Sequence, residues 1–334
     1  METVRVPSKV VAAMAFVAHE SIMNTSCISL SGFARKHGGG FRRTSADKRP
    51  ARSGFSEMSG AGAPGRPVPV RRESPRVSTA SDPSTGQTRH LMTRDPRIVW
   101  LHVTSAADWI GPRLHGFALD TGSIVPEGFD AYCRVLHPFR GRSDDKPTRT
   151  WAEVAAENGR IMHPEVQPHT IFRPIGAKKP KDWAHDHTTD NELEWGSCPP
   201  AVLGALVDVL GRHTATPERC WFCAWEGRGF LDFDGVRERV RLPSRNYLLY
   251  TGPIELATTP LDDVCGRSSP HLWWPDDRAW IVATEIDFAW TYVGGASSLV
   301  GELLDDPRIE ALAAELSDEP FYGSDTVNEA LDAP

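Results

Sequence analysis

An alternation of apolar and polar side chains from Ala279 to Trp290 constrains the fold of this chain most strongly. Because successive side chains of a β-strand point to opposite faces, the alternation predicts one extended strand. One face, which we expect in the core, carries Trp280, Val282, Thr284, Ile286, Phe288 and Trp290. The other, which we expect to leave room for a ligand above two carboxylates, carries Ala279, Ile281, Ala283, Glu285, Asp287 and Ala289.

The loop before this strand adds aromatic and charged residues to the predicted site. Two adjacent tryptophans offer large surfaces for stacking, and Pro275 stiffens the loop. We predict a pocket with aromatic walls and an acidic floor, suited to a cationic or hydroxyl-rich ligand. Its candidate ligand-binding residues are Trp273, Trp274, Asp276, Asp277, Arg278, Glu285, Asp287 and Tyr292. In the alternative interpretation, the tryptophans fill the core and Arg278 pairs with an acid to hold the loop.

Charge divides the chain into two parts. Residues 1–97 hold 16 Lys and Arg against 7 Asp and Glu, whereas residues 98–334 hold 21 against 37. From about Gly32 to Arg94, Gly, Ser, Arg and Pro predominate, so this segment buries too little apolar surface to offset the entropy of ordering. We predict a disordered basic arm over 1–94, a globular acidic domain over 95–320 and a C-terminal tail over 321–334. Met92 is a candidate alternative start.

The same composition bears on location and partners. Phosphate binding needs clustered Lys and Arg, so the acidic body argues against nucleic acid as its partner. No run reaches the ~18 apolar residues of a membrane span, and the apolar run from Val10 to Ala18 is only a weak match to a signal peptide. The six cysteines do not resemble a disulfide framework. We therefore expect a cytoplasmic protein with reduced thiols and no membrane partner.

Periodicity and turn residues predict the elements of the domain. Expected strands lie within 97–103, 129–137, 219–227, 239–243 and 246–252. Expected helices begin at a Thr148 cap, near Pro199, near Ser297 and at Asp306, and 162–194 is expected to be a long loop or lid. Strands and helices mix without regular βαβ alternation. This pattern predicts one α+β domain with an antiparallel or mixed sheet and packed helices.

Three short motifs suggest chemistry but fit structural roles better. Cys220 and Cys223 lie three apart in a predicted strand, so their thiols should point to opposite faces and not meet. His185 and His187 have metal-ligand chemistry but no third ligand. The glycines before Ser297 lack the lysine of a phosphate loop. We therefore predict no metal and no cofactor.

Several segments resemble a family of uncharacterised actinobacterial proteins. They include SPHLWWPDDRAWIVATEIDFAWTYVGG, LLDDPRIEAL, HGFALDTGSIVPEGFDAYCRVLHP, GRIMHPEVQ, TPERCWFCAWEG and LPSRNYLLYTGPI. The resemblance covers roughly Ile98 to Leu316. It implies the domain boundary and a bacterial cytoplasm, and it transfers no catalytic residue because the family has no assigned activity.

Two functional hypotheses follow. The first is a non-catalytic domain that binds a small molecule or a protein, because no familiar catalytic motif is present. The alternative is an enzyme of unfamiliar type, such as a hydrolase that uses Glu285 or Asp287 as base. Neighbouring carboxylates on one strand face the same way rather than flanking a bond, which argues against glycoside hydrolysis.

Overall fold

The computed structural model describes residues 79–81, 88–90, 95–116, 120–141, 148–172, 191–228, 235–261 and 268–331. These residues fall into two units, the first of which contains β1 (Thr79–Ser81) and β2 (Thr88–His90). The two strands pair in antiparallel fashion, three residues each. They lie within the segment predicted to be a disordered arm, and the rest of that prediction falls outside the described residues.

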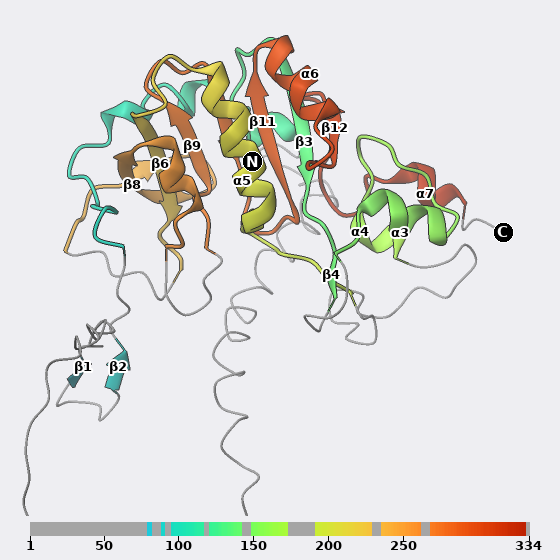
Figure 1. Cartoon of the computed structure of the whole chain (residues 1–334), viewed down its shortest axis with the longest axis horizontal. Helices are drawn as coiled ribbons and strands as arrows, with labels where there is room; N and C mark the ends of the chain where they lie inside the picture. Colours follow the sequence, from blue (N-terminus) through green and yellow to red (C-terminus); the bar gives the residue numbers. More distant parts are fainter. Residues whose placement is uncertain are drawn as a thin grey trace, which may run out of the picture. The chain divides into compact units, whose positions relative to one another are not determined.

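The second unit is built on an eight-stranded sheet in which every neighbouring pair is antiparallel (Figure 1). In spatial order the strands are β12 (Ala311–Ala314), β3 (Ala131–Leu136), β11 (Trp290–Gly295), β10 (Trp280–Ala283), β9 (Leu272–Pro275), β6 (Cys220–Trp225), β8 (Asn246–Gly252) and β7 (Val240–Arg241). A small separate pair joins β4 (Arg140–Gly141) to β5 (Asn191–Glu192). The predicted α+β class with an antiparallel sheet is confirmed.

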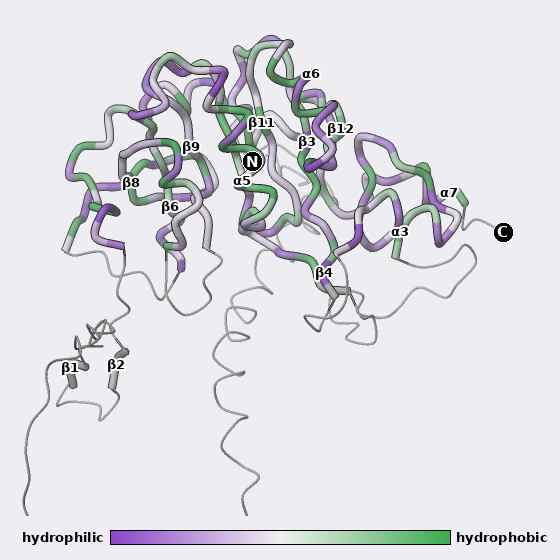
Figure 2. The backbone as a smooth tube through the Cα atoms, viewed as in Figure 1, coloured by the Kyte–Doolittle hydropathy of each residue, from purple (hydrophilic) through white to green (hydrophobic). Residues whose placement is uncertain are grey.

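Helices α5 (Pro200–Leu210) and α6 (Ser297–Asp305) lie across one face of the sheet (Figure 1). The short 3₁₀ helix η8 (Ile254–Thr258) joins them in the same core. Figure 2 shows α5 rich in hydrophobic residues, which match its buried side. The predictions of α5 and α6 are confirmed, although neither has a side-chain cap.

The opposite face of the sheet is also buried. It packs against η3 (Ser105–Ala107), against residues that flank η4 (Gly111–Arg113) and follow η5 (Thr121–Ser123), and against α3 (Trp151–Glu157) and α4 (Pro168–Ile171). The thiols of Cys220 and Cys223 enter different cores and both cysteines are free, as their spacing predicts. Because both faces are covered, strands such as β10 are buried at every residue.

Two predicted elements are wrong near the ends of the unit. Residues 97–103 form no strand: Leu101 N donates to Leu249 O at 2.8 Å, but Val99 and Val103 are exposed. The helix expected from Asp306 is replaced by a turn and by β12. Its sequence suits a helix, yet β3 offers an open backbone edge, and tertiary pairing overrides local propensity.

The single strand predicted from Ala279 to Trp290 is also wrong. Strands β10 and β11 form a hairpin, and residues 284–289 turn the chain between them. Phe288 N donates to Glu285 O within the turn, and Gly196 N donates to Phe288 O from outside it. Gly196 has φ +68°, and a Cβ there would lie 2.4 Å from Ile286 O. The turn therefore depends on a distant glycine that allows close backbone approach.

Helix α3 shows how side chains fix an element's start. Thr150 accepts from Glu153 N, and the Glu153 side chain accepts from Thr150 N, which forms a capping box. Glu310 also accepts from the first helical amides, Trp151 N at 2.6 Å and Ala152 N at 2.7 Å. The cap is therefore Thr150, and the predicted Thr148 cap is wrong.

Replacing Thr150 with alanine should lower the free energy of unfolding by about 1 kcal/mol, because an amide loses its acceptor. Urea denaturation measures the loss. The exposed Thr148 provides a matched control, and Thr148→Ala should change the free energy by less than about 0.5 kcal/mol. Equal losses in the two variants would contradict the assignment of the cap.

A buried polar chain connects the β10–β11 hairpin to the segment before α5. His137 Nδ1 donates to Glu194 O at 2.8 Å, so its Nε2 accepts from Thr291 Oγ1 at 2.9 Å. Thr284 Oγ1 completes the chain at 2.8 Å from Thr291 Oγ1. Burial lowers the pKa of His137 to about 4, despite the opposing effect of the bond to Glu194. The imidazole is therefore neutral in the folded protein at neutral pH.

This depressed pKa should make stability depend on pH. An unfolded His137 takes up a proton as pH falls below about 6.5, whereas the folded one does so only near 4. The contribution of His137 to the free energy of unfolding is therefore complete above about pH 6.5. It is lost as pH falls from about 6.5 to about 4, by up to about 1.4 kcal/mol per pH unit. His137→Gln should remove this part of the slope in urea titrations. Identical slopes for wild type and variant would contradict the neutral imidazole.

Candidate functional site

The adjacent tryptophans of the predicted site are not exposed. Trp273 and Trp274 lie in β9 with 0% and 1% of their surface accessible. Trp273 packs on the α5 side, with its ring 5.2 Å from that of Trp280. Trp274 faces the other core and meets Trp109 edge-on at 6.0 Å. The expectation that they form open aromatic walls is wrong, because strand pairing places one ring in each core.

The acids after β9 have structural partners. Asp276 accepts from Trp221 Nε1 at 3.0 Å and pairs with Arg219 at 3.2 Å. Asp277 accepts from Thr214 Oγ1 at 2.9 Å and from Ala215 N at 2.7 Å. Both carboxylates thus connect the turn between β9 and β10 to residues 214–221, which lead into β6.

Arg278 does not pair with either of these acids in the described structure. It has φ 56°, is exposed, and places its guanidinium 5.4 Å from the Trp109 ring centre. Strand β10 separates it from Glu285, and four residues of strand span about 13 Å. The structure therefore does not bring the two predicted halves of the pocket together.

Glu285 and Asp287 instead converge on Arg245, which the sequence analysis missed. Arg245 Nη2 lies 2.8 Å from Glu285 Oε1 and 2.9 Å from Asp287 Oδ2. Arg245 belongs to the turn between β7 and β8, where Leu242 N donates to its carbonyl. No local pattern marks it, because the contact joins two turns about 40 residues apart in the sequence.

The three charged side chains are nearly buried, with 13–16% of each side chain exposed. Burial raises the pKa of Glu285, which Arg245 opposes and Asp287 reinforces. For Arg245, burial lowers the pKa, but attraction to Glu285 and Asp287 outweighs it and raises the pKa. Burial thus favours the protonated form of Glu285 more than water would.

A hollow lies beside Glu285 on the face of the sheet opposite α5. Its volume is about 300 Å³ when open solvent is included, and the enclosed space holds about one water molecule. The lining residues are Leu114, Ser123, Ile124, Leu242, Ser244, Tyr247, Leu272, Ala283, Thr284 and Glu285. Apolar side chains and hydroxyl groups therefore surround one desolvated carboxyl group.

Tyr292 is buried in β11 and does not line this hollow. Thr121 Oγ1 donates to its hydroxyl at 3.3 Å. Burial raises the pKa of Tyr292. Of the predicted ligand-binding residues, Glu285 is therefore the one that reaches the hollow, with Asp287 joined to it through Arg245.

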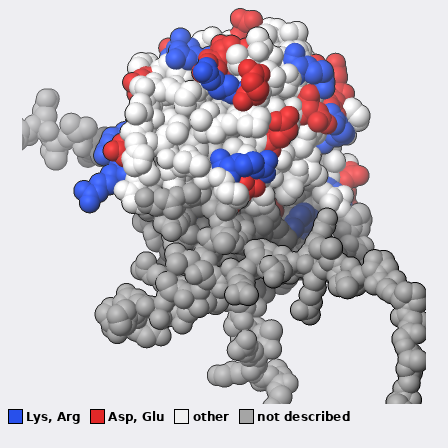
Figure 3. All heavy atoms as spheres, turned by 60° about the vertical axis from the view of Figure 1, so that its left-hand side comes forward, with Lys and Arg blue, Asp and Glu red and all other residues white. Residues whose placement is uncertain are grey.

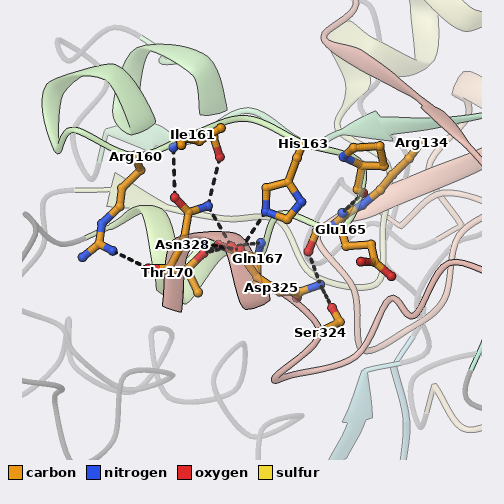
Figure 4. Close-up of polar contacts among 11 residues, drawn as sticks. Arg134, Arg160, Ile161, His163, Glu165, Gln167, Thr170, Ser324, Asp325 and Asn328 are labelled. Atoms are coloured by element: carbon orange, nitrogen blue, oxygen red, sulfur yellow. Dashed lines mark hydrogen bonds and ion pairs between the residues drawn. The ribbon is translucent and has the colours of Figure 1, made fainter. Parts of the chain in front are cut away.

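A second polar cluster, beyond the predicted domain boundary at 320, centres on Asp325 (Figure 4). Its carboxylate is fully buried and accepts from His163 Nε2 at 2.7 Å and from Thr170 Oγ1. The remaining donors are Gln167 N, Asn328 N and Asn328 Nδ2, at 3.2, 2.9 and 2.9 Å. Burial alone would raise the pKa of Asp325, but these bonds outweigh it and lower the pKa.

We call Asp325 and its four hydrogen-bonding residues, His163, Gln167, Thr170 and Asn328, the Asp325 network. Its geometry fits a structural role rather than a catalytic one. It fixes α7 (Thr326–Ala330), whose first turn Asp325 caps, to the segment that contains α4. Five donors occupy the carboxylate, so little acceptor capacity remains for a substrate. Sequence analysis could have recognised Asp325 as a helix cap, but its bonds to His163 and Thr170 join distant segments.

Charge on the described surface is mixed. On the face in Figure 3, Lys and Arg lie beside Asp and Glu and form no continuous basic area. The described helices include none long and apolar enough to cross a membrane. Within the same residues, no cluster of three His, Cys, Asp or Glu could hold a metal ion. His185 and His187 lie outside the described part of the chain, as does most of the predicted lid.

The sequence matches no protein-family model, no curated protein and no solved structure. The resemblance to an actinobacterial family and the cytoplasmic location therefore stay predictions.

Arg245→Met should lower the free energy of unfolding by about 3 kcal/mol, because two nearly buried carboxylates lose their cation. Urea denaturation tests this value. Arg219→Met is the control: its pair with Asp276 is much more exposed and should be worth less than about 1 kcal/mol. Adding Glu285→Gln and Asp287→Asn to the Arg245 variant should restore most of the loss. A cost no larger than that of the control would contradict the buried ion pair.

Proposed function

We propose that this domain binds a small ligand without catalysis, at the hollow beside Glu285. One observation carries the proposal: Glu285 is a desolvated carboxyl group at the edge of an open hollow with mixed apolar and hydroxyl walls. Binding sites commonly combine an apolar lining with a few polar groups that orient the ligand. An ionisable group whose pKa burial shifts is a further mark of such sites.

The shape and charge of the hollow support one class of ligand. The enclosed space admits a group about the size of water, such as an ammonium or hydroxyl. Leu114, Ile124 and Leu242 would contact the ligand's apolar body, while Ser123 and Ser244 offer hydroxyls. A hydrogen-bond donor or small cation would satisfy the part of the Glu285 carboxylate that faces away from Arg245. A compact apolar molecule with one amine or hydroxyl fits this description best.

Binding is favoured over hydrolysis by the position of Arg245. A raised pKa suits Glu285 as a general acid, which supports the alternative. However, Glu285 and Asp287 share one guanidinium, and proton transfer by either must work against that ion pair. Their convergence on one cation also differs from two carboxyl groups that flank a scissile bond.

A thermal-shift screen of the full chain should identify the ligand class. Small amines should raise the melting temperature more than uncharged alcohols of matched shape, because a cation is attracted to the Glu285 carboxylate that pairs with Arg245. A ligand at 100 times its dissociation constant adds about 2.7 kcal/mol to the free energy of unfolding. In Glu285→Gln the stabilisation should disappear, while the Arg245–Asp287 pair remains to support the fold.

Asp276→Asn is the matched control, because its acid lies at the far end of β10 and should not affect binding. Stabilisation of wild type and Glu285→Gln to the same extent would exclude Glu285 as the binding group. Turnover of the stabilising compound by wild type alone would favour the hydrolase.

A further inference from the structure

Three exposed apolar side chains lie around the Asp325 network. Ile161, Tyr322 and Val327 have 48%, 55% and 40% of their surface accessible. We call these three residues the α7 patch. They come from segments about 160 residues apart in the sequence, so their association is a product of the fold.

One of the three residues contacts a member of this network, one is adjacent to a member in sequence, and one contacts a residue adjacent to a member. Ile161 N donates to Asn328 Oδ1, and Asn328 Nδ2 donates to Ile161 O, both at 2.9 Å (Figure 4). Val327 is the neighbour of Asn328 in α7. The Tyr322 ring stacks on His169 at 4.0 Å, and His169 precedes Thr170, a donor to Asp325. The three residues of the patch are therefore all linked to one buried pair, Asp325 and Asn328, which we call the hub.

The hub holds this surface in place. Asp325 and Asn328 are fully buried, and their hydrogen bonds fix the backbone at Ile161 and at the start of α7. Exposed apolar side chains on a mobile chain end would not by themselves indicate a binding surface. Here buried polar bonds hold them, so a partner would lose little conformational entropy in binding them.

The exposed charged side chains next to the patch in sequence are acidic, because Arg160, which precedes Ile161, is buried and donates to Asn328 O at 2.9 Å. Residues 309–331 contain no Lys or Arg, and the segment 161–172 contains none either. Besides the buried Asp325, the acids of these two segments are Glu165, Glu310, Glu315, Asp318, Glu319 and Glu329. Glu315 and Glu319 are exposed, and Asp318 and Glu329 are half-buried. A partner on this surface meets apolar contacts and negative charge together.

We propose that the α7 patch docks a peptide segment of a partner protein that carries both apolar and basic side chains. Its apolar residues would cover Ile161, Tyr322 and Val327, and its Lys or Arg would face the surrounding acids. Complementary charge selects such a segment over an acidic one, which like-charge contact would repel. The proposal does not depend on the hollow beside Glu285.

Fluorescence polarisation with two labelled peptides tests the proposal on the full chain. One probe is a repeating Leu and Lys peptide, and the other has Glu in place of each Lys. The Leu–Lys peptide should bind, more weakly at high salt, and the Leu–Glu peptide should not. Val327→Lys and Ile161→Lys should each weaken binding by about tenfold or more, because they remove apolar contact and add repulsion.

Val103→Lys is the matched control, because Val103 is also an exposed valine, with 68% of its surface accessible. It adds the same charge away from the patch and should change affinity by less than about twofold. Equal weakening by Val103→Lys and Val327→Lys would show general charge attraction and overturn the proposal. Absence of Leu–Lys binding, or loss of it in Glu285→Gln, would also overturn it. Thermal melts establish that each variant is folded.

Discussion

Burial of the central sheet on both faces determines where this protein can place chemistry. In β6, β9 and β10, side chains alternate between two closed cores, so the middle of each strand is occupied by apolar groups. Large aromatic side chains such as Trp273 and Trp274 fill these cores. Polar groups that could meet a ligand are left at strand ends and turns. The hollow beside Glu285 and the Asp325 network both lie at such places.

Buried charge at those ends is compensated in two different ways. Arg245 joins Glu285 and Asp287, so two acids share one cation. Asp325 has no arginine in contact in the described structure and relies on His163, Thr170 and amide donors instead. The first arrangement leaves a carboxyl group beside an open hollow. The second uses its carboxylate fully and presents an apolar patch above it.

The sequence predicted elements well where the local pattern and the tertiary contacts agree. Strand β3 and helix α5 show the expected periodicity and cores. The opposed thiols of Cys220 and Cys223 follow directly from strand geometry. Prediction failed at the β10–β11 turn because apolar residues continue through it without Gly, Pro or Asn. That turn is held from outside by the Gly196 amide and by Arg245.

The sequence by itself determined the α+β class, the strands β3, β6, β7 and β8, and many of the residues that are apolar enough to be core. These properties depend on local periodicity, which a linear pattern records. Only the tertiary structure decided that Trp273 and Trp274 are enclosed, that Glu285 pairs with Arg245 and that Asp325 joins α7 to α4. Such contacts connect segments tens to more than a hundred residues apart, and their energies arise from burial, which no local stretch of sequence encodes.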